Sequence, residues 1–211
     1  MRVARTFAFL DLCGFTEFAS TKGDDEATRV LAGFRSSLRE IASRRGVRVD
    51  KWLGDGAMIV GVEPEPCVAT VLEVEHRIDD GSSDLPLRVG MTTGLVILFE
   101  GDDYIGTTVN LASRLCDAAK PRQIVAVPAL RNYLPAWASV HDLGPAPIAG
   151  FHDPVDMVQV SRRPPGREQF TDPVCGMVLP LDGAMAHTMG RPFCSESCAA
   201  SWTDRALRTP G

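Results

Sequence analysis

The stretch Phe9-Leu10-Asp11-Leu12-Cys13-Gly14-Phe15-Thr16 decides the fold, because in it an apolar strand ends in a carboxylate and then turns through glycine into a helix start. The segment from Arg5 to Leu12 is largely apolar up to Asp11, which predicts a strand buried on both faces of a sheet. Free amides at a helix N-terminus attract phosphate, and a strand-end carboxylate can hold a divalent cation against it. By itself the motif is weak, because such an aspartate is about as often a helix cap or a turn former.

Two further motifs carry polar groups that could join this site. In Lys51-Trp52-Leu53-Gly54-Asp55-Gly56, the Asp-Gly pair favours a tight hairpin turn and places Asp55 at its tip, beside the first strand. A plain turn is the alternative interpretation. In the segment from Asp103 to Arg114, Asn110 and Arg114 lie four residues apart on one face of a predicted helix. An ordinary helix would carry them as solvated polar residues.

The rest of the pattern predicts an α/β sandwich with a mixed sheet and helices on one of its faces. Helical periodicity runs over residues 24–45, 64–78 and 109–119. Strand-like residues occupy 47–53, 57–62, 87–98 and 124–127, with weaker candidates at 140–143 and 157–160. Turn-rich residues fall at 79–84 and 101–103.

Composition excludes several classes of protein. A net charge of −5 over 211 residues leaves no broad basic face for nucleic acid or anionic lipid, so we expect no nucleic-acid partner. No stretch approaches the roughly 18 consecutive apolar residues that span a bilayer. Asp11 also interrupts the apolar N-terminus that a signal peptide would need. We therefore expect a cytoplasmic protein with no membrane span.

A change of composition near residue 160 predicts two domains. Residues 1–160 form the larger one, residues 161–169 read as a charged, proline-containing linker, and residues 170–208 form a small domain. A segment of about 40 residues usually needs a metal, disulfides or a partner to fold. Because the cytosol keeps thiols reduced, we interpret the clustered Cys175, Cys194 and Cys198 as metal ligands. The scattered Cys13, Cys67 and Cys116 are expected to be buried apolar residues.

Taken in this order, the motifs of residues 9–16, 51–56 and 103–114 resemble the class III adenylyl and guanylyl cyclase catalytic domain, over about residues 4 to 160. The resemblance implies a ferredoxin-like core with active sites that form only between two domains, here those of a homodimer. It implies that Asp11 and Asp55 bind two Mg²⁺ or Mn²⁺ ions. Beside these ions the resemblance places the Leu12 carbonyl and the phosphate-binding amides of Gly14, Phe15 and Thr16.

The same resemblance assigns the substrate-contacting residues. Lys51 and Asp103 fall where the family recognises the base, while Asn110 and Arg114 fall where it positions the ribose and stabilises the transition state. Adenine presents an amino donor beside a ring acceptor, which a lysine and an aspartate complement, so we expect ATP as substrate and cyclic AMP as product. A guanylyl cyclase is the alternative within the family. Another is a catalytically silent regulator, which the lack of a triphosphate-binding lysine at 148–150 favours.

The C-terminal segment carries a second resemblance. Residues 172–177 (DPVCGM) and 192–198 (PFCSESC) resemble the YHS domain, a relative of small TRASH-like, heavy-metal-associated modules. Three thiolates and His187 would complete a four-coordinate site for Zn²⁺ or another thiophilic metal. The spacing does not decide between a structural metal, a sensed metal that regulates the cyclase, and no metal.

Overall fold

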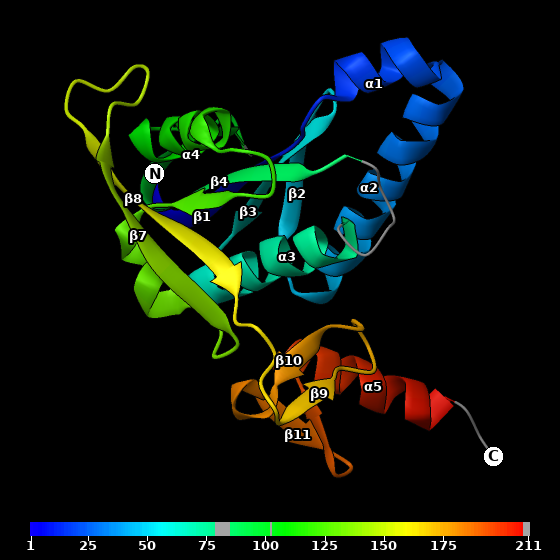
Figure 1. The fold of residues 1–211 in the computed structure, drawn as a ribbon. Coiled ribbons are helices and arrows are strands. Elements are labelled where there is room, and N and C mark those ends of the chain that lie inside the picture. Colours follow the sequence, from blue (N-terminus) through cyan, green and yellow to red (C-terminus); the bar gives the residue numbers. More distant parts are fainter. Residues whose placement is uncertain (79–84, 102, 209–211) are drawn as a thin grey trace.

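A mixed sheet of eight strands forms the centre of the computed structural model, which describes residues 1–78, 85–101 and 103–208 (Figure 1). The sheet has the order β2-β3-β1-β4-β6-β8-β7, and β5 pairs with β4 outside this path. Among the strand pairs of the described residues, β4 and β6 alone run parallel. The strands are β1 (Arg2–Leu12), β2 (Arg48–Leu53), β3 (Gly56–Gly61), β4 (Leu87–Phe99), β5 (Asp103–Ile105), β6 (Ile124–Ala126), β7 (Ala138–Ala146) and β8 (Val155–Arg162).

The register of the central strands sets the position of the acidic motifs. Asp11 lies opposite Gly56 of β3 on one side and opposite Arg88 of β4 on the other. A Cβ atom at Gly56 would lie 2.6 Å from the Leu10 carbonyl oxygen, so only glycine allows β3 to approach β1 this closely. The turn that carries Asp55 is thereby held against the end of β1.

Helices cover both faces of the sheet, so the prediction that they share one face is wrong. Helices α2 (Asp24–Arg44) and α3 (Pro64–Arg77) pack in the same buried cluster as Leu10, whereas α4 (Thr107–Ala118) packs over Phe7 from the opposite face (Figure 1). Successive side chains of a strand point to opposite faces, and both faces of β1 are apolar. Helical periodicity reveals an apolar helix face but not the sheet face that it covers.

Most elements predicted for residues 1–160 are present, including the helix that starts after Gly14, and the structure adds strand β5 and a 3₁₀ helix (Pro128–Tyr133). Helix α1 (Phe15–Lys22) follows the Gly14 turn and is separated from α2 by Gly23, which has a φ of 88°. Strand β5 begins at Asp103, which was expected to be the last residue of a turn. The turn expected at 79–84 lies outside the described residues, as does residue 102 of the turn expected at 101–103. None of the helices in the described ranges is long and apolar enough to cross a bilayer.

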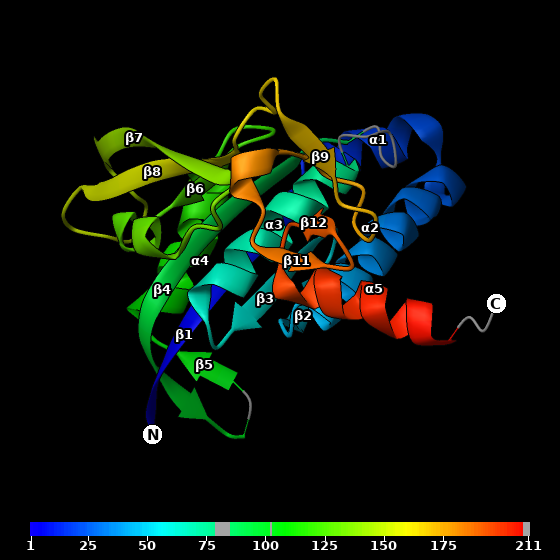
Figure 2. The same cartoon turned by 90° about the horizontal axis from the view of Figure 1, so that it is seen from below.

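The C-terminal segment folds into two small hairpins and a helix that lie against α2 and α3 (Figure 2). Its elements are β9 (Gln169–Thr171), β10 (Val178–Pro180), β11 (Ala186–Thr188), β12 (Arg191–Phe193) and α5 (Glu196–Arg208). Phe170, Leu179 and Phe193 belong to the same buried apolar cluster as α2 and α3. The indole N–H of the buried Trp137 donates to the Cys194 carbonyl at 2.8 Å, which ties the segment to the larger domain.

Candidate active site and C-terminal thiol cluster

The two acids predicted to bind metal line one pocket of about 550 Å³ at the end of β1. Leu12 and the first turn of α1, from Gly14 to Thr16, line the same pocket. Gly14 has a φ of 78°, a left-handed conformation that lets the chain turn from strand into helix. The first amides of α1 have no partner within the helix, so they are available to an anion. The structure thus brings together all the predicted metal-binding and phosphate-binding residues.

The charges of this pocket suit a divalent cation. Burial, and to a lesser degree the neighbouring Asp11 carboxylate, raise the pKa of Asp55, because two nearby anions repel each other. Asp11 forms an ion pair with Arg88, whose guanidinium lies 2.8 Å from its Oδ2. Carboxylate and carbonyl oxygens are the ligands that Mg²⁺ and Mn²⁺ prefer. The sequence analysis missed Arg88. The signal that could have found it is the antiparallel pairing of β1 with β4, which places an arginine near the start of β4 opposite Asp11 near the end of β1.

The predicted base-recognition residues form a direct pair. The Lys51 ammonium donates to Oδ1 of Asp103 at 2.7 Å, and both side chains are about half exposed. Asp103 also accepts from the Tyr104 amide at 2.9 Å, and the Lys51 hydrogen bond is the main reason that its pKa lies below the ordinary value. The pair joins β2 to β5 and presents both a donor and an acceptor to solvent.

Asn110 and Arg114 line a second pocket, of about 440 Å³, beside α4. Residues 149–152 form its other wall, so the segment without the triphosphate-binding lysine lies here. The Arg114 guanidinium is exposed and lies 3.1 Å from Asp117, one turn further along α4. The two pockets have no lining residue in common, so within one chain Asn110 and Arg114 are not brought into the acidic pocket.

An exposed apolar patch lies at the end of the β4–β5 hairpin. Leu95, Ile97 and Phe99 alternate along β4, so they point to the same face, and Ile105 lies opposite Ile97 in the register. Their exposed fractions range from 41% to 62%. Contiguous exposed apolar residues of this kind mark contact surfaces.

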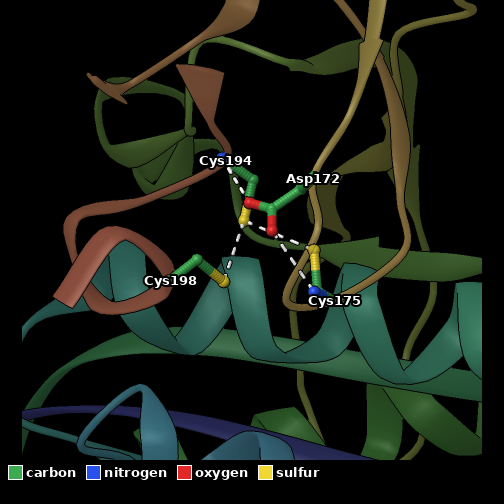
Figure 3. A group of neighbouring side chains, drawn as sticks. All are labelled: Asp172, Cys175, Cys194 and Cys198. Carbon is green, nitrogen blue, oxygen red and sulfur yellow. Dashed lines mark hydrogen bonds between the residues drawn. The ribbon is translucent and has the colours of Figure 1, made fainter. Parts of the chain in front are cut away.

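The three C-terminal cysteines lie together with Asp172, and His187 is not in the group (Figure 3). Their ligand atoms and a carboxylate oxygen of Asp172 all lie within 4.8 Å of one another. Cys194 Sγ is 3.7 Å from Cys175 Sγ and 3.5 Å from Cys198 Sγ. His187 is exposed on β11, so an acid occupies the place in which the sequence predicted an imidazole. The spacing of residues along the chain could not reveal that Asp172 joins the thiols, because the turn at 172–176 sets the position of its carboxylate.

The remaining cysteines follow the prediction in two of three cases. Cys67 and Cys116 are buried, and burial raises the pKa of each thiol to about 12. Cys13 is only partly buried and borders the acidic pocket.

Comparison with known proteins identifies the family. Residues 4–160 match the family described as the adenylate and guanylate cyclase catalytic domain. A pH-sensitive adenylate cyclase of Mycobacterium tuberculosis is 32% identical over 129 residues, covering 61% of this chain and 32% of that protein. An uncharacterized protein of the same organism is 32% identical over 163 residues, covering 77% of this chain and 43% of the relative. The chain therefore spans less than half the length of these relatives.

Solved structures agree with this match. The adenylyl cyclase CyaB from Pseudomonas aeruginosa superimposes with a TM-score of 0.68 at 28% identity, covering 79% of this chain and 98% of that one. A guanylate cyclase domain from Catenaria anguillulae gives a TM-score of 0.67 at 21% identity, which is a likeness of fold. The chain belongs to the family of adenylate and guanylate cyclase catalytic domains.

Proposed function

We propose that the chain is an adenylate cyclase that converts ATP to 3′,5′-cyclic AMP and pyrophosphate at sites shared by two copies. One observation carries the proposal: the predicted metal-binding acids and the Asn110–Arg114 pair line two pockets that share no lining residue among those described. A two-fold dimer would join the acidic pocket of one copy to the α4 pocket of the other. The exposed apolar residues of the β4–β5 hairpin offer a contact surface for such a dimer.

Asp11, Asp55 and the Leu12 carbonyl would hold two Mg²⁺ or Mn²⁺ ions. These ions would lower the pKa of the ribose 3′-hydroxyl and neutralise the departing pyrophosphate. Burial, with a smaller contribution from the Asp11 carboxylate, raises the pKa of Asp55, and this supports the assignment because a bound cation would stabilise both carboxylates. The amides of Gly14 to Thr16 would donate to the phosphate oxygens.

We propose that Arg88 supplies the positive charge for the triphosphate that a lysine at residues 148–150 would otherwise supply. Its guanidinium lines the acidic pocket and pairs with Asp11. When a cation takes Asp11, Arg88 can turn its donors to the triphosphate, and a planar guanidinium binds phosphate in a bidentate way. The missing lysine is then no argument for a silent regulator.

The partner copy would supply the remaining contacts. Asn110 would orient the ribose, and Arg114 would place fixed donors where charge develops on the transferring phosphorus. Lys51 and Asp103 would read the adenine edge, the lysine donating to a ring nitrogen and the carboxylate accepting from the amino group. Their mutual 2.7 Å hydrogen bond supports this, because it holds donor and acceptor side by side before the base arrives.

We also propose that residues 170–208 form a YHS-type module that binds a thiophilic ion and regulates the cyclase. Three thiols whose sulfur atoms lie within 4.8 Å of one another support the ion, and the shared apolar cluster supports communication with the larger domain.

The test is synthesis of cyclic nucleotide by the purified chain from ATP and from GTP, each with Mg²⁺ and with Mn²⁺. We expect cyclic AMP in excess over cyclic GMP, and a loss of activity in Asp11→Ala and Asp55→Ala with unchanged thermal melts. Preference for GTP would make the protein a guanylate cyclase. No product under any combination would make it a silent regulator.

A further inference from the structure

We infer that Asp172, Cys175, Cys194 and Cys198 bind one thiophilic divalent cation and that Arg45, at the end of α2, balances the negative charge of this site. Binding of the cation would then fasten the C-terminal module to the cyclase domain. The site itself rests on distances and buried charges, whereas any effect on the cyclase rate rests on the proposed function.

The sulfur spacing fits a single ion. A tetrahedral zinc site with Zn–S bonds of about 2.3 Å separates its sulfur atoms by roughly 3.8 Å. The two Sγ–Sγ distances from Cys194 are 3.7 and 3.5 Å, far longer than the roughly 2.05 Å of a disulfide. Neutral thiols in simple contact would have similar spacing, so the charges around the cluster must distinguish the two cases.

Asp172 is the first sign that a cation belongs here. Its carboxylate is fully buried, and it forms no ion pair with any residue in the described ranges. Three backbone amides donate to it: Val174 and Cys175 to Oδ1, and Cys194 to Oδ2. A carboxylate accepts about four hydrogen bonds, so Oδ2 keeps a lone pair for an ion among the sulfurs. A buried acid with only neutral partners is costly unless a cation joins it.

Arg45 is the second sign, because it brings a buried positive charge to the cluster. Arg44 and Arg45 both pair with Glu73 of α3, and all three side chains are at most 10% exposed. Arg77 also lies 3.6 Å from Glu73 and is hydrogen-bonded to Glu40, so three arginines face two carboxylates. The surplus faces the thiols, since Nη2 of Arg45 lies 3.2 Å from Cys194 Sγ. Glu65 lines the neighbouring cleft, but the sulfur is the acceptor in direct contact. A guanidinium donating to sulfur stabilises the thiolate that a metal requires.

The two signs complement each other. Three thiolates and one carboxylate around a divalent cation carry a net charge of about −2, and a buried guanidinium offsets part of it. Arg45 belongs to the domain that carries the cyclase motifs, so the charge of the thiol site is balanced across the boundary between the two parts. Helices α2 and α3, which hold Arg44 and Glu73, pack beneath the strands that position Asp11 and Asp55. Loss of the cation would thus weaken the docking of the module on these helices.

The experiment titrates the full-length, reduced, metal-free chain with Zn²⁺ and, for its spectrum, with Co²⁺. We expect one equivalent bound outside the active site, with a tetrahedral Co²⁺ spectrum and a thiolate-to-metal charge-transfer band. To remove the active-site ions from the count, the titration is repeated in the Asp55→Ala chain, in which uptake at the thiol site should be unchanged. This background also separates the two hypotheses, because zinc uptake without cyclase activity in the wild type would refute only the proposed function.

Matched variants test each member of the site. Cys198→Ser should abolish the charge-transfer band, and Asp172→Asn, which keeps an acceptor for the turn amides, should weaken Zn²⁺ binding at least tenfold. Arg45→Met should weaken it more than Arg44→Met, since Arg44 shares Glu73 but has no hydrogen bond to sulfur among the contacts described. His187→Ala should leave binding unchanged. Circular dichroism checks the fold, and if Cys198→Ser does not fold, Asp172→Asn carries the test.

Docking has its own measurement. Zn²⁺ should slow amide hydrogen exchange in the last turn of α2 and in residues 170–200, and it should slow proteolysis at residues 163–168 in the wild type but not in Asp172→Asn. Two results would overturn the inference: a reduced chain that takes up no Zn²⁺, or uptake that is insensitive to both Asp172→Asn and Arg45→Met.

Discussion

Replacement of Gly90 with alanine tests how tightly α4 must sit on the sheet for Arg114 to act. A Cβ atom at Gly90 would lie 2.1 Å from the Cys116 amide nitrogen and 2.2 Å from the Ala112 carbonyl oxygen, both in the backbone of α4. Ordinary contact begins near 3.4 Å, so helix and strand must separate by about 1.3 Å. Neither contact atom belongs to a side chain that could rotate away.

The displacement sets the size of the effect. A misplacement of about 1 Å can cost on the order of 10²-fold in rate, and forced overpacking costs about 1 to 3 kcal/mol of stability. We expect Gly90→Ala to lower kcat for ATP about 10²-fold, measured as the initial rate of cyclic AMP formation. Denaturant unfolding of the same samples should give a free energy lower by about 1 to 3 kcal/mol.

Gly33→Ala is the matched control. Gly33 lies inside α2, and its added Cβ would meet nothing within 4 Å. The change should stabilise the chain by about 0.5 to 1 kcal/mol and leave kcat unaltered. If Gly90→Ala kept both its melting temperature and a kcat within threefold of the wild type, the close seating of α4 would have no role in catalysis.

Three further predictions follow from other contacts. Mixing inactive Arg114→Ala and Asp55→Ala chains should restore about a quarter of the wild-type rate under random exchange, because half of the dimers would be heterodimers with one of their two sites intact. Proven heterodimers without activity would refute the shared site. Arg88→Met should raise KM for ATP roughly tenfold, with Arg88→Lys intermediate, as expected for a lost charge-assisted contact. An unchanged KM would show that Arg88 does not contact the substrate. The hydrogen bond from Arg77 lowers the pKa of Glu40 in the folded chain. The contribution of this bond to folding stability is therefore present above the pKa that Glu40 has in the unfolded chain, and it is lost as the pH falls through the pKa in the folded chain. Glu40→Gln should therefore destabilise the chain by less than about 1 kcal/mol at pH 7 and by less as the pH falls below the unfolded-state pKa, as urea unfolding at several pH values can check.

Local signals were sufficient for the part of the molecule that matches the cyclase family. The apolar run before Asp11, the Asp-Gly turn at Asp55 and the helical spacing of Asn110 and Arg114 each appear as predicted. In each case the sequence neighbours of the residue also determine its local geometry. The roles of these residues in catalysis remain predictions.

Contacts set by tertiary structure were not predictable in the same way. The sheet face that α4 covers depends on which apolar face of β1 is left open, and both are apolar. Strand β5 is three residues long and forms only because β4 extends beyond the residues that pair with β6 and leaves Ile97 and the two residues after it open as a partner. Asp172 reaches the thiols because its turn folds back on β12, whereas His187 had only favourable spacing in its support.

The buried Arg45, Glu73 and Trp137 have a consequence for the comparison of genomes. In a cyclase domain with no module over α2 and α3, Arg45 and Trp137 would lose their hydrogen bonds to Cys194, and nothing in the nucleotide chemistry would select an arginine, its Glu73 partner and a tryptophan at these positions. The trio should then be inherited together with the cysteine-bearing extension and drift where the extension has been lost. A survey of related genes could thus recognise, from the catalytic domain alone, those that evolved alongside such a partner.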